Sequence, residues 1–546
     1  MNASMNPLCP TLRVLLVLLI LSSGTACTGK GLRIESIDPR IGNMGEILTI
    51  LGSGFQDERG DNRVSIAGSS PTASSYIEWT DKRIAVRVPD FGESGLVYVH
   101  IGGKRSNAAL FTNRASVPLP ISSNEEGIGP RASNLDQSTA TIGGAVTISG
   151  KNFGAARENG EVLFSWDAET PPSAPAAVRA PDWVAVSDLE FGYELWSDRE
   201  IRVRVPDGAS SGNLVVKTAR GISDPLYIEL LDKPGTKIFK EKRTYAFNYS
   251  VEVQVSRVSG PNTLYLWVPQ PISNPAQRNR QLVSRSLDPF VENHRGTSLF
   301  QLKDLTAGSS TRISLSYIVD TYTVETQIKP ALVKRGTPGP IRSAYTLSNP
   351  LIPADDREII KLAEKLVGKE RNPYLQARKL YDWLVLSAGI GTVPFDGKPQ
   401  DILIAKKADA YTASFLFCAL ARSLGIPSLP VSGFVVDRNR TSFRHWWAEF
   451  WLDGFGWIPV DPAFGAGAVP SGLTLRTDKS DYYFGNMDNQ RIVFSRGFAE
   501  LSPMDPRGRI VARPKVWALQ NLWEESVGAL DSYSSLWNDI TVSGIY

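Results

Sequence analysis

The sequence predicts a multidomain protein in which three antiparallel β domains precede an α+β domain. Its 546 residues exceed the size at which one hydrophobic core keeps growing, and 42% hydrophobic with 21% charged residues is a globular composition. Short alternating segments separated by Gly and Pro fill the first part of the chain, which is typical of β-sandwiches. After residue 350 the apolar period changes from 2 to 3.6, which indicates helices.

Composition excludes several classes of function. The 59 Lys and Arg residues nearly balance the 56 Asp and Glu residues, for a formal net charge of +3, so the chain lacks the basic face that nucleic acid binding requires. Its three cysteines and three histidines have neither the spacing of a disulfide framework nor that of metal ligands. We therefore expect no nucleic acid partner, no metal and no cofactor. The residues concerned are Cys9, Cys27, Cys418, His100, His294 and His445.

Residues 1–26 resemble a bacterial signal peptide. Arg13 precedes the apolar run 14–21, and small residues then lead to Cys27. This run is shorter than the roughly 20 residues that span a bilayer, so a permanent transmembrane anchor is the weaker interpretation. Small residues before a cysteine resemble a lipoprotein signal, which implies that Cys27 is lipidated and attaches the chain to a membrane. The alternative is ordinary cleavage after Ala26. Either way we expect export to the cell envelope, in the periplasm or at the cell surface.

Two stretches in the first half of the chain repeat each other. Residues 45–55 recur as 143–153, and the strand 84–90, which ends in Val-Pro-Asp, recurs as 201–207. Alternating strands between Gly, Pro, Asn and Asp turns predict two antiparallel sandwiches. The predicted boundaries are 31–113 for the first sandwich, 114–129 for a linker and 130–231 for the second sandwich, with an extra loop around residues 171–175.

The recurring glycine pattern that ends in Phe55 and Phe153 resembles IPT/TIG domains, which are immunoglobulin-like modules common in surface proteins. This resemblance implies two all-β immunoglobulin-like sandwiches. Such modules bind a partner or a glycan through their loops, or they act as spacers. We favour spacers, because no aromatic or charged cluster in the sequence marks a binding face.

A third β domain is predicted over residues 240–330. Tyr245, Phe247 and Tyr249 begin an alternation that continues to Val255, and a second strand is expected near residues 313–317. An alternation of apolar and polar residues over this length predicts a strand whose apolar face packs on a hydrophobic core.

Helices follow from residue 355. Asp355 or Asp356 can cap a helix whose apolar set runs from Ile359 to Val367, and Gly368 can end it. Asn372 and Pro373 predict the start of a second helix, over residues 375–384. A third helix is expected over residues 411–424, before the Gly-Ile-Pro sequence at 425–427.

Three ordered motifs resemble the transglutaminase-like superfamily, which has a papain-type Cys-His-Asp triad. They are the helix ending in Gly-Ile-Pro, the run 444–451 with His445, and the run 456–462 with Asp461. The resemblance covers residues 350–500 and implies an α+β transglutaminase-like, papain-like domain in which His445 and Asp461 match the triad. The family's spacing places its cysteine at Ala410. The nucleophile is therefore missing, and loss of a nucleophile costs on the order of 10⁶ in rate.

Cys418 is a poor substitute for the missing nucleophile. It lies eight residues further along the same predicted helix, ~12 Å away at ~1.5 Å per residue, and away from the helix start where thiolates are stabilised. The apolar residues around it predict a small core residue instead.

His445 and Asp461 flank a predicted hairpin with its turn near Asp453 and Gly454. Their side chains share a face only if the loop is odd in length or contains a bulge, and we predict that geometry. The carboxylate then orients the imidazole as in a triad, or the pair simply holds two strands together. Trp446 and Trp447 are candidates to line the family's cleft, although neighbouring strand residues must point to opposite faces.

Residues 501–546 form the end of the chain. The aromatic-rich segment from Trp517 to Trp537 predicts a helix that packs against the β domain.

The leading hypothesis is an exported, lipid-anchored pseudoenzyme whose transglutaminase-like domain binds a peptide, a protein or a cell-envelope polymer. The second is an active cysteine-type amidase, peptidase or acyltransferase with a non-standard nucleophile. The third is a purely structural envelope scaffold.

Overall fold

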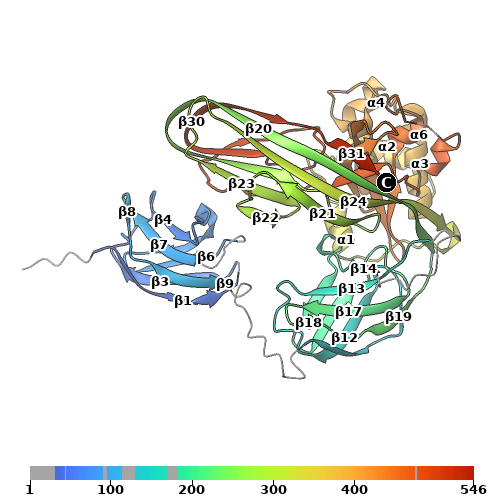
Figure 1. Cartoon of the computed structure of the whole chain (residues 1–546). Coiled ribbons are helices and arrows are strands. Elements are labelled where there is room, and N and C mark those ends of the chain that lie inside the picture. The colour runs from blue at the N-terminus through green and yellow to red at the C-terminus, as the bar shows by residue number, and fades with distance from the viewer. Residues whose placement is uncertain (1–30, 44, 90–94, 114–128, 170–181, 474–475) are drawn as a thin grey trace, which may run out of the picture. The chain divides into compact units, whose positions relative to one another are not determined.

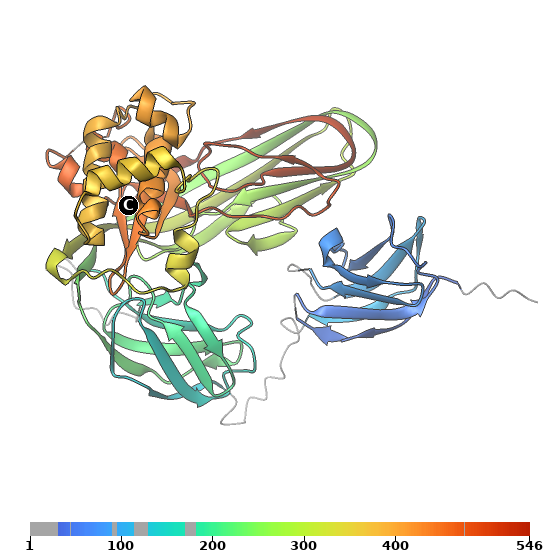
Figure 2. The same ribbon diagram turned by 180° about the vertical axis from the view of Figure 1, so that it is seen from behind.

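The computed structural model describes residues 31–43, 45–89, 95–113, 129–169, 182–473 and 476–546 (Figures 1 and 2). The signal peptide, Cys27, most of the linker and the loop around residues 171–175 are predictions that lie outside these residues. The chain divides into two compact units, Met1–Asn113 and Arg114–Tyr546.

The first unit is a sandwich of two sheets, with strand orders β1-β3-β6-β5 and β2-β9-β7-β4, and β8 beside β7. Alternation builds its core: in β3, Leu48 and Ile50 are buried while Ile47 and Leu51 are exposed. The strands are β1 (Arg33–Asp38), β2 (Ile41–Gly42), β3 (Ile47–Ser53), β4 (Arg63–Ile66), β5 (Tyr76–Trp79), β6 (Arg83–Arg87), β7 (Gly95–Ile101), β8 (Lys104–Arg105) and β9 (Ala109–Asn113).

The second module, from Arg131 to Leu230, has the corresponding strand orders β10-β12-β16-β15 and β11-β19-β17-β13-β14, with β18 beside β17. The prediction of two β-sandwiches is therefore confirmed. The strands are β10 (Arg131–Leu135), β11 (Thr139–Ala140), β12 (Ala145–Lys151), β13 (Glu161–Trp166), β14 (Asp182–Ala185), β15 (Tyr193–Trp196), β16 (Glu200–Arg204), β17 (Gly212–Thr218), β18 (Gly221–Ile222) and β19 (Leu226–Leu230).

The repeated glycines have a steric reason. A Cβ atom at Gly52 would lie 2.0 Å from the carbonyl oxygen of Arg33, and one at Gly150 would lie 2.1 Å from that of Arg131. In both modules the first strand passes too close for any side chain, so only glycine fits.

The β domain is built on two long strands, β20 and β24, which confirms the alternation predicted from Tyr245 to Val255. The sheet has the order β21-β24-β20-β23-β22, and the C-terminal strands β30 and β31 also pair with β20. The strands are β20 (Gly235–Pro269), β21 (Gln277–Arg285), β22 (Val291–His294), β23 (Thr297–Lys303), β24 (Ser310–Ile328), β29 (Arg509–Val511), β30 (Glu524–Trp537) and β31 (Thr541–Ile545).

The helix predicted between Trp517 and Trp537 is wrong, because this segment supplies strand β30. Its tryptophans do pack against the β domain: Trp517, Trp523 and Trp537 belong to the core formed by β20 and β24. Gly528, at a φ of 78°, and several serines make the segment a poor helix. Pairing with β20 satisfies its backbone groups instead, so tertiary contact decides the secondary structure.

The α+β domain has the predicted helices. Asp356 caps α2 by accepting hydrogen bonds from the backbone N–H groups of Glu358 and Ile359, and Asn372 caps α3 in the same way. Among the described residues, no helix is long and apolar enough to cross a bilayer. The helices are α1 (Pro340–Tyr345), α2 (Arg357–Val367), α3 (Pro373–Ser387), α4 (Ile402–Ala405), α5 (Ala410–Ser423), α6 (Pro462–Ala466) and α7 (Lys479–Tyr482).

A four-stranded sheet of order β27-β26-β25-β28 completes this domain. Helices α2, α3 and α5 pack with Phe450 of β26 and Ile458 of β27 in one buried cluster, in the lobe beside β31 in Figure 1. The strands are β25 (Ser428–Val436), β26 (Ser442–Leu452), β27 (Gly456–Val460) and β28 (Arg491–Arg496).

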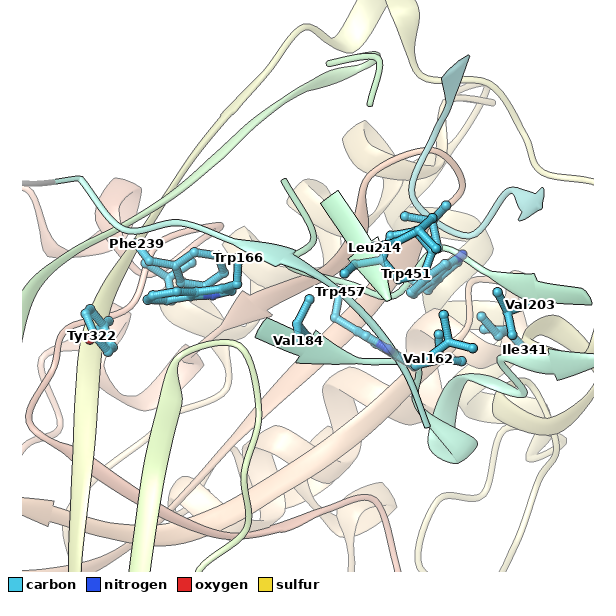
Figure 3. Packing of buried hydrophobic residues seen from close by; sticks show 14 of the residues in the cluster. Val162, Trp166, Val184, Val203, Leu214, Phe239, Tyr322, Ile341, Trp451 and Trp457 are labelled. Carbon is cyan, nitrogen blue, oxygen red and sulfur yellow. The ribbon is translucent and has the colours of Figure 1, made fainter. Parts of the chain in front are cut away.

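The second module, the β domain and the α+β domain share one hydrophobic core. Figure 3 shows Val162 and Leu214 of the module in the same cluster as Phe239 and Tyr322 of the β domain and Trp457 of β27. The ring centroid of Trp166 lies 5.5 Å from that of Phe239 and 5.0 Å from that of Tyr322. The second module is thus an integral part of the second unit.

Candidate functional site

The β26–β27 hairpin brings His445 and Asp461 together. Leu452 pairs with Gly456, so residues 453–455 form a loop of odd length, as predicted. The two side chains therefore share a face, and the His445 Nε2 to Asp461 Oδ2 distance is 2.7 Å.

Asp461 is the centre of a larger buried network. Its Oδ1 accepts a hydrogen bond from the backbone N–H of Phe464 at 3.0 Å, which caps α6. Its Oδ2 also accepts from Arg491 Nη1 at 2.6 Å, and Arg491 Nη2 donates to Asp488 at 3.1 Å. Sequence reasoning missed Arg491, because no spacing rule links β28 to the hairpin.

The carboxyl group of Asp461 stays ionised. Burial alone would raise its pKa, but the charges of His445 and Arg491 and the hydrogen bonds from His445 and the Phe464 N–H outweigh it and lower the pKa to about 2. A carboxylate only accepts hydrogen bonds, so Nε2 of His445 carries a proton and donates a hydrogen bond to Asp461. The carboxylate fixes the tautomer as in a triad.

This pKa predicts acid lability. An unfolded Asp titrates near 3.8 and the folded Asp461 near 2, so its contribution is present above pH 4 and is lost as the pH falls through 2. A shift of this size corresponds to about 2 kcal/mol of stability. We expect the urea midpoint to fall more steeply between pH 4 and 2 in the parent than in Asp461→Asn. If the urea midpoints of the parent and of Asp461→Asn fall in parallel with pH, the Asp461 carboxylate is not the group whose titration destabilises the fold.

Ala410 is the first residue of α5, as the spacing predicted. Asp409 caps the helix: its Oδ1 accepts from the Thr412 N–H at 2.8 Å. Among the described residues, the N–H groups of Ala410 and Tyr411 have no hydrogen-bond partner. Ala410 is partly exposed and Tyr411 is buried, so the first of these donors lies near the surface at the positive end of the helix dipole.

Cys418 is a core residue, which confirms its interpretation. Its side chain is fully buried in the second half of α5, and burial raises the pKa of its thiol to about 12. A neutral, inaccessible thiol is neither a nucleophile nor a metal ligand. Within the described residues, no group of three or more His, Cys, Asp or Glu side chains is arranged to hold a metal ion.

Trp446 and Trp447 lie on opposite faces of β26. Trp446 faces α5, with its ring 5.6 Å from that of Tyr411, and its buried Nε1 has no partner among the described residues. Trp447 is buried beside His445, at a centroid distance of 6.1 Å. Strand alternation turns Trp447 into the shared core, where it lines a small cavity of about 60 Å³. That the two tryptophans line the family's cleft stays a prediction.

The contacts around the described site residues thus form two groups. In one group, His445 is hydrogen-bonded to Asp461 and its ring contacts those of Trp447 and Phe464. In the other group, the ring of Tyr411 at the start of α5 contacts that of Trp446. No hydrogen bond or ring contact among the described residues links Ala410 to His445.

Comparison with known families identifies two domains. The model of the transglutaminase-like superfamily matches residues 360–462, and that of the IPT/TIG domain matches residues 32–113. The chain therefore contains a transglutaminase-like core domain, which includes Ala410, His445 and Asp461, and an IPT/TIG domain.

Individual relatives are distant. An uncharacterized protein of Haemophilus influenzae is 26% identical over 297 residues, which cover 46% of this chain and 78% of that protein. A candidate cysteine protease from Cytophaga hutchinsonii has a solved structure that is 17% identical, with a TM-score of 0.35, over 57% of this chain and 92% of that one. SGBP-B from a xyloglucan utilization locus of Bacteroides uniformis is 11% identical, with a TM-score of 0.15, over 54% of this chain and 99% of that one.

Proposed function

We propose that the transglutaminase-like domain is a non-catalytic binding module that holds an amide-bearing ligand, a peptide or a cell-envelope polymer, at the start of α5. The observation that carries this proposal is the pair of unpartnered N–H groups of Ala410 and Tyr411, together with the unpartnered indole N–H of Trp446, whose ring lies 5.6 Å from that of Tyr411. All three are donors, and a carbonyl oxygen of the ligand is the acceptor that they fit.

Three features argue against catalysis at this position. The methyl group of Ala410 cannot attack an acyl carbon. The Cys418 thiol is buried and neutral. The hydroxyl of Ser414, one turn into the helix, is fully buried and donates to the carbonyl oxygen of Ala410 at 2.7 Å. An enzyme of the amidase or peptidase class would need a nucleophile that these groups do not provide.

The buried network of Asp461 on the other face of β26 holds the strands of this domain together. Asp461 joins His445 of β26 and Arg491 of β28 at the end of β27, so one carboxylate ties three strands together. This arrangement favours the structural role that the sequence left open for the pair.

Export and anchoring belong to the same proposal. A short apolar run followed by small residues and Cys27 supports a lipid-modified N-terminus that holds the chain at a membrane of the cell envelope. The ligand would then be an envelope component.

Calorimetric titration of the full chain tests the proposal, with N-acetylated tetrapeptide amides and soluble peptidoglycan fragments as probes. Ala410→Glu should abolish binding, because its carboxylate occupies the helix-terminal donors while suiting the helix dipole, so the fold is kept. Trp446→Phe should weaken binding about fivefold through loss of one donor. Trp383→Phe, a half-buried tryptophan of α3, is the matched control. Equal affinity of the parent and Ala410→Glu would refute this site.

A second candidate is the envelope scaffold. The shared core of the second module, the β domain and the α+β domain favours it, because one core holds these three parts in a fixed arrangement. If no probe binds the parent chain, the scaffold function is favoured over the binding module.

A further inference from the structure

A cleft lies between the second module and the β domain, away from the start of α5. It has a volume of about 550 Å³, within the usual range for small-molecule sites. Strand β14 (Asp182–Ala185), at the edge of its sheet, forms one wall, and the start of β21 forms the other. Consecutive residues of both strands line it, so the strand edges face the cleft.

The walls contain buried polar groups that a passive gap between domains would not need. Glu190, Gln277 and Arg278 line the cleft, and each is more than nine-tenths buried. Arg278 Nη2 donates to the Trp183 carbonyl at 2.7 Å and to Asp182, but its buried Nε has no partner among the described residues. Buried polar atoms are normally satisfied, so this donor is an unmet hydrogen-bonding group in the wall of the cleft.

A smaller cavity of about 60 Å³ lies next to the cleft, and Asp207, Gln277 and Arg496 are among the residues that line both. This inner cavity reaches Arg491 and Trp457. Arg491 Nε and Trp457 Nε1 are again buried donors without a partner among the described residues. Unsatisfied N–H donors therefore lie in the walls of both spaces.

The charges around both spaces nearly cancel. Lys237 pairs with Asp207, and Arg278 pairs with Asp182. Arg496 pairs with Glu449 at 2.7 Å, and Arg491 pairs with Asp488 at 3.1 Å.

Two lining groups remain outside these pairs. Burial and the Asp207 charge raise the pKa of Glu190 to about 7, so near neutrality its carboxyl group both donates and accepts. Arg280, at the exposed rim, donates to Gln270 at 2.6 Å. A strongly charged ligand therefore has no advantage here.

We propose that this cleft binds a neutral saccharide. Hydroxyl groups both donate and accept, so they suit unpartnered N–H donors and the Glu190 carboxyl together. Trp183 adds a half-buried aromatic ring on the cleft wall: Val184 points into the module core, so its neighbour points outward. No residue of this cleft lies within the transglutaminase-like match at 360–462.

Titration of the full chain with cellotriose, maltotriose and chitotriose tests the proposal. At least one trisaccharide should bind, and Trp183→Ala should weaken it tenfold or more. Ala185→Trp, which fills the cleft from the strand edge, should abolish binding. Trp196→Phe is the matched control, because this tryptophan of the same module does not line the cleft.

The proposal is overturned if no trisaccharide binds at millimolar concentration, if both cleft variants bind as the parent does, or if a neutral N-acetylated tripeptide amide binds this cleft as tightly. Ala410→Glu should leave saccharide binding unchanged, so this result is independent of the site at α5.

Discussion

An Ala410→Cys variant is expected to react rapidly with iodoacetamide at neutral pH. The new thiol would sit at the first position of α5, where free N–H groups and the helix dipole stabilise a thiolate. A pKa lowered to 7 or below makes at least half of the thiol ionised, which is on the order of 10-fold more than in a free cysteine with pKa ~8.5. Cys418, with a pKa of about 12 and no exposure, should stay unlabelled.

Peptide mapping after timed labelling measures both positions in one sample. The parent chain is the control for every other thiol. Labelling at position 410 no faster than that of free cysteine would contradict the donor arrangement on which the binding site rests. Adding His445→Gln measures the contribution of the imidazole: an unchanged rate assigns the reactivity to the helix, and a slower one brings His445 into the site.

Replacement of Asp461 by Ala is expected to destabilise the second unit strongly. Arg491 is almost fully buried and would lose one of its two carboxylate partners, while His445 and the Phe464 N–H would lose theirs. Breaking a buried ion pair from one side costs about 3–5 kcal/mol, because an uncompensated charge remains.

Urea unfolding followed by circular dichroism checks this prediction. The matched control is Asp478→Ala, which removes the ion pair with Arg476 where both side chains are half exposed. Surface pairs of this kind contribute about 1 kcal/mol or less. Equal effects of the two substitutions would show that the network does not hold the strands together. The double variant Asp461→Ala, Arg491→Met should lose less than the sum of the two single losses.

Local signals predicted much of this fold. Helices α2 and α3 begin at capping residues that the sequence marks, and the alternation from Tyr245 to Val255 predicted β20. The pairing of His445 with Asp461 was predicted from the family resemblance, and the odd loop that it requires is present. Each of these features depends on residues close together in the chain.

Long-range features were missed for a common reason. β30 forms a strand because β20 offers a free edge, although its own aromatic residues suggested a helix. Arg491 reaches Asp461 only because β28 is added to the sheet beside β25. Trp447 is core because the second module packs on that face of the hairpin.

The sequence by itself determined the fold class, the repeat of two sandwiches and the alanine at the start of α5, since these depend on residue identity, spacing and period. Only the tertiary structure decided that the second module shares a core with the α+β domain, that one carboxylate joins three strands, and that a polar cleft opens beside β14. The physical reason is that burial and strand-edge pairing select partners across hundreds of residues, and local periodicity does not encode that choice.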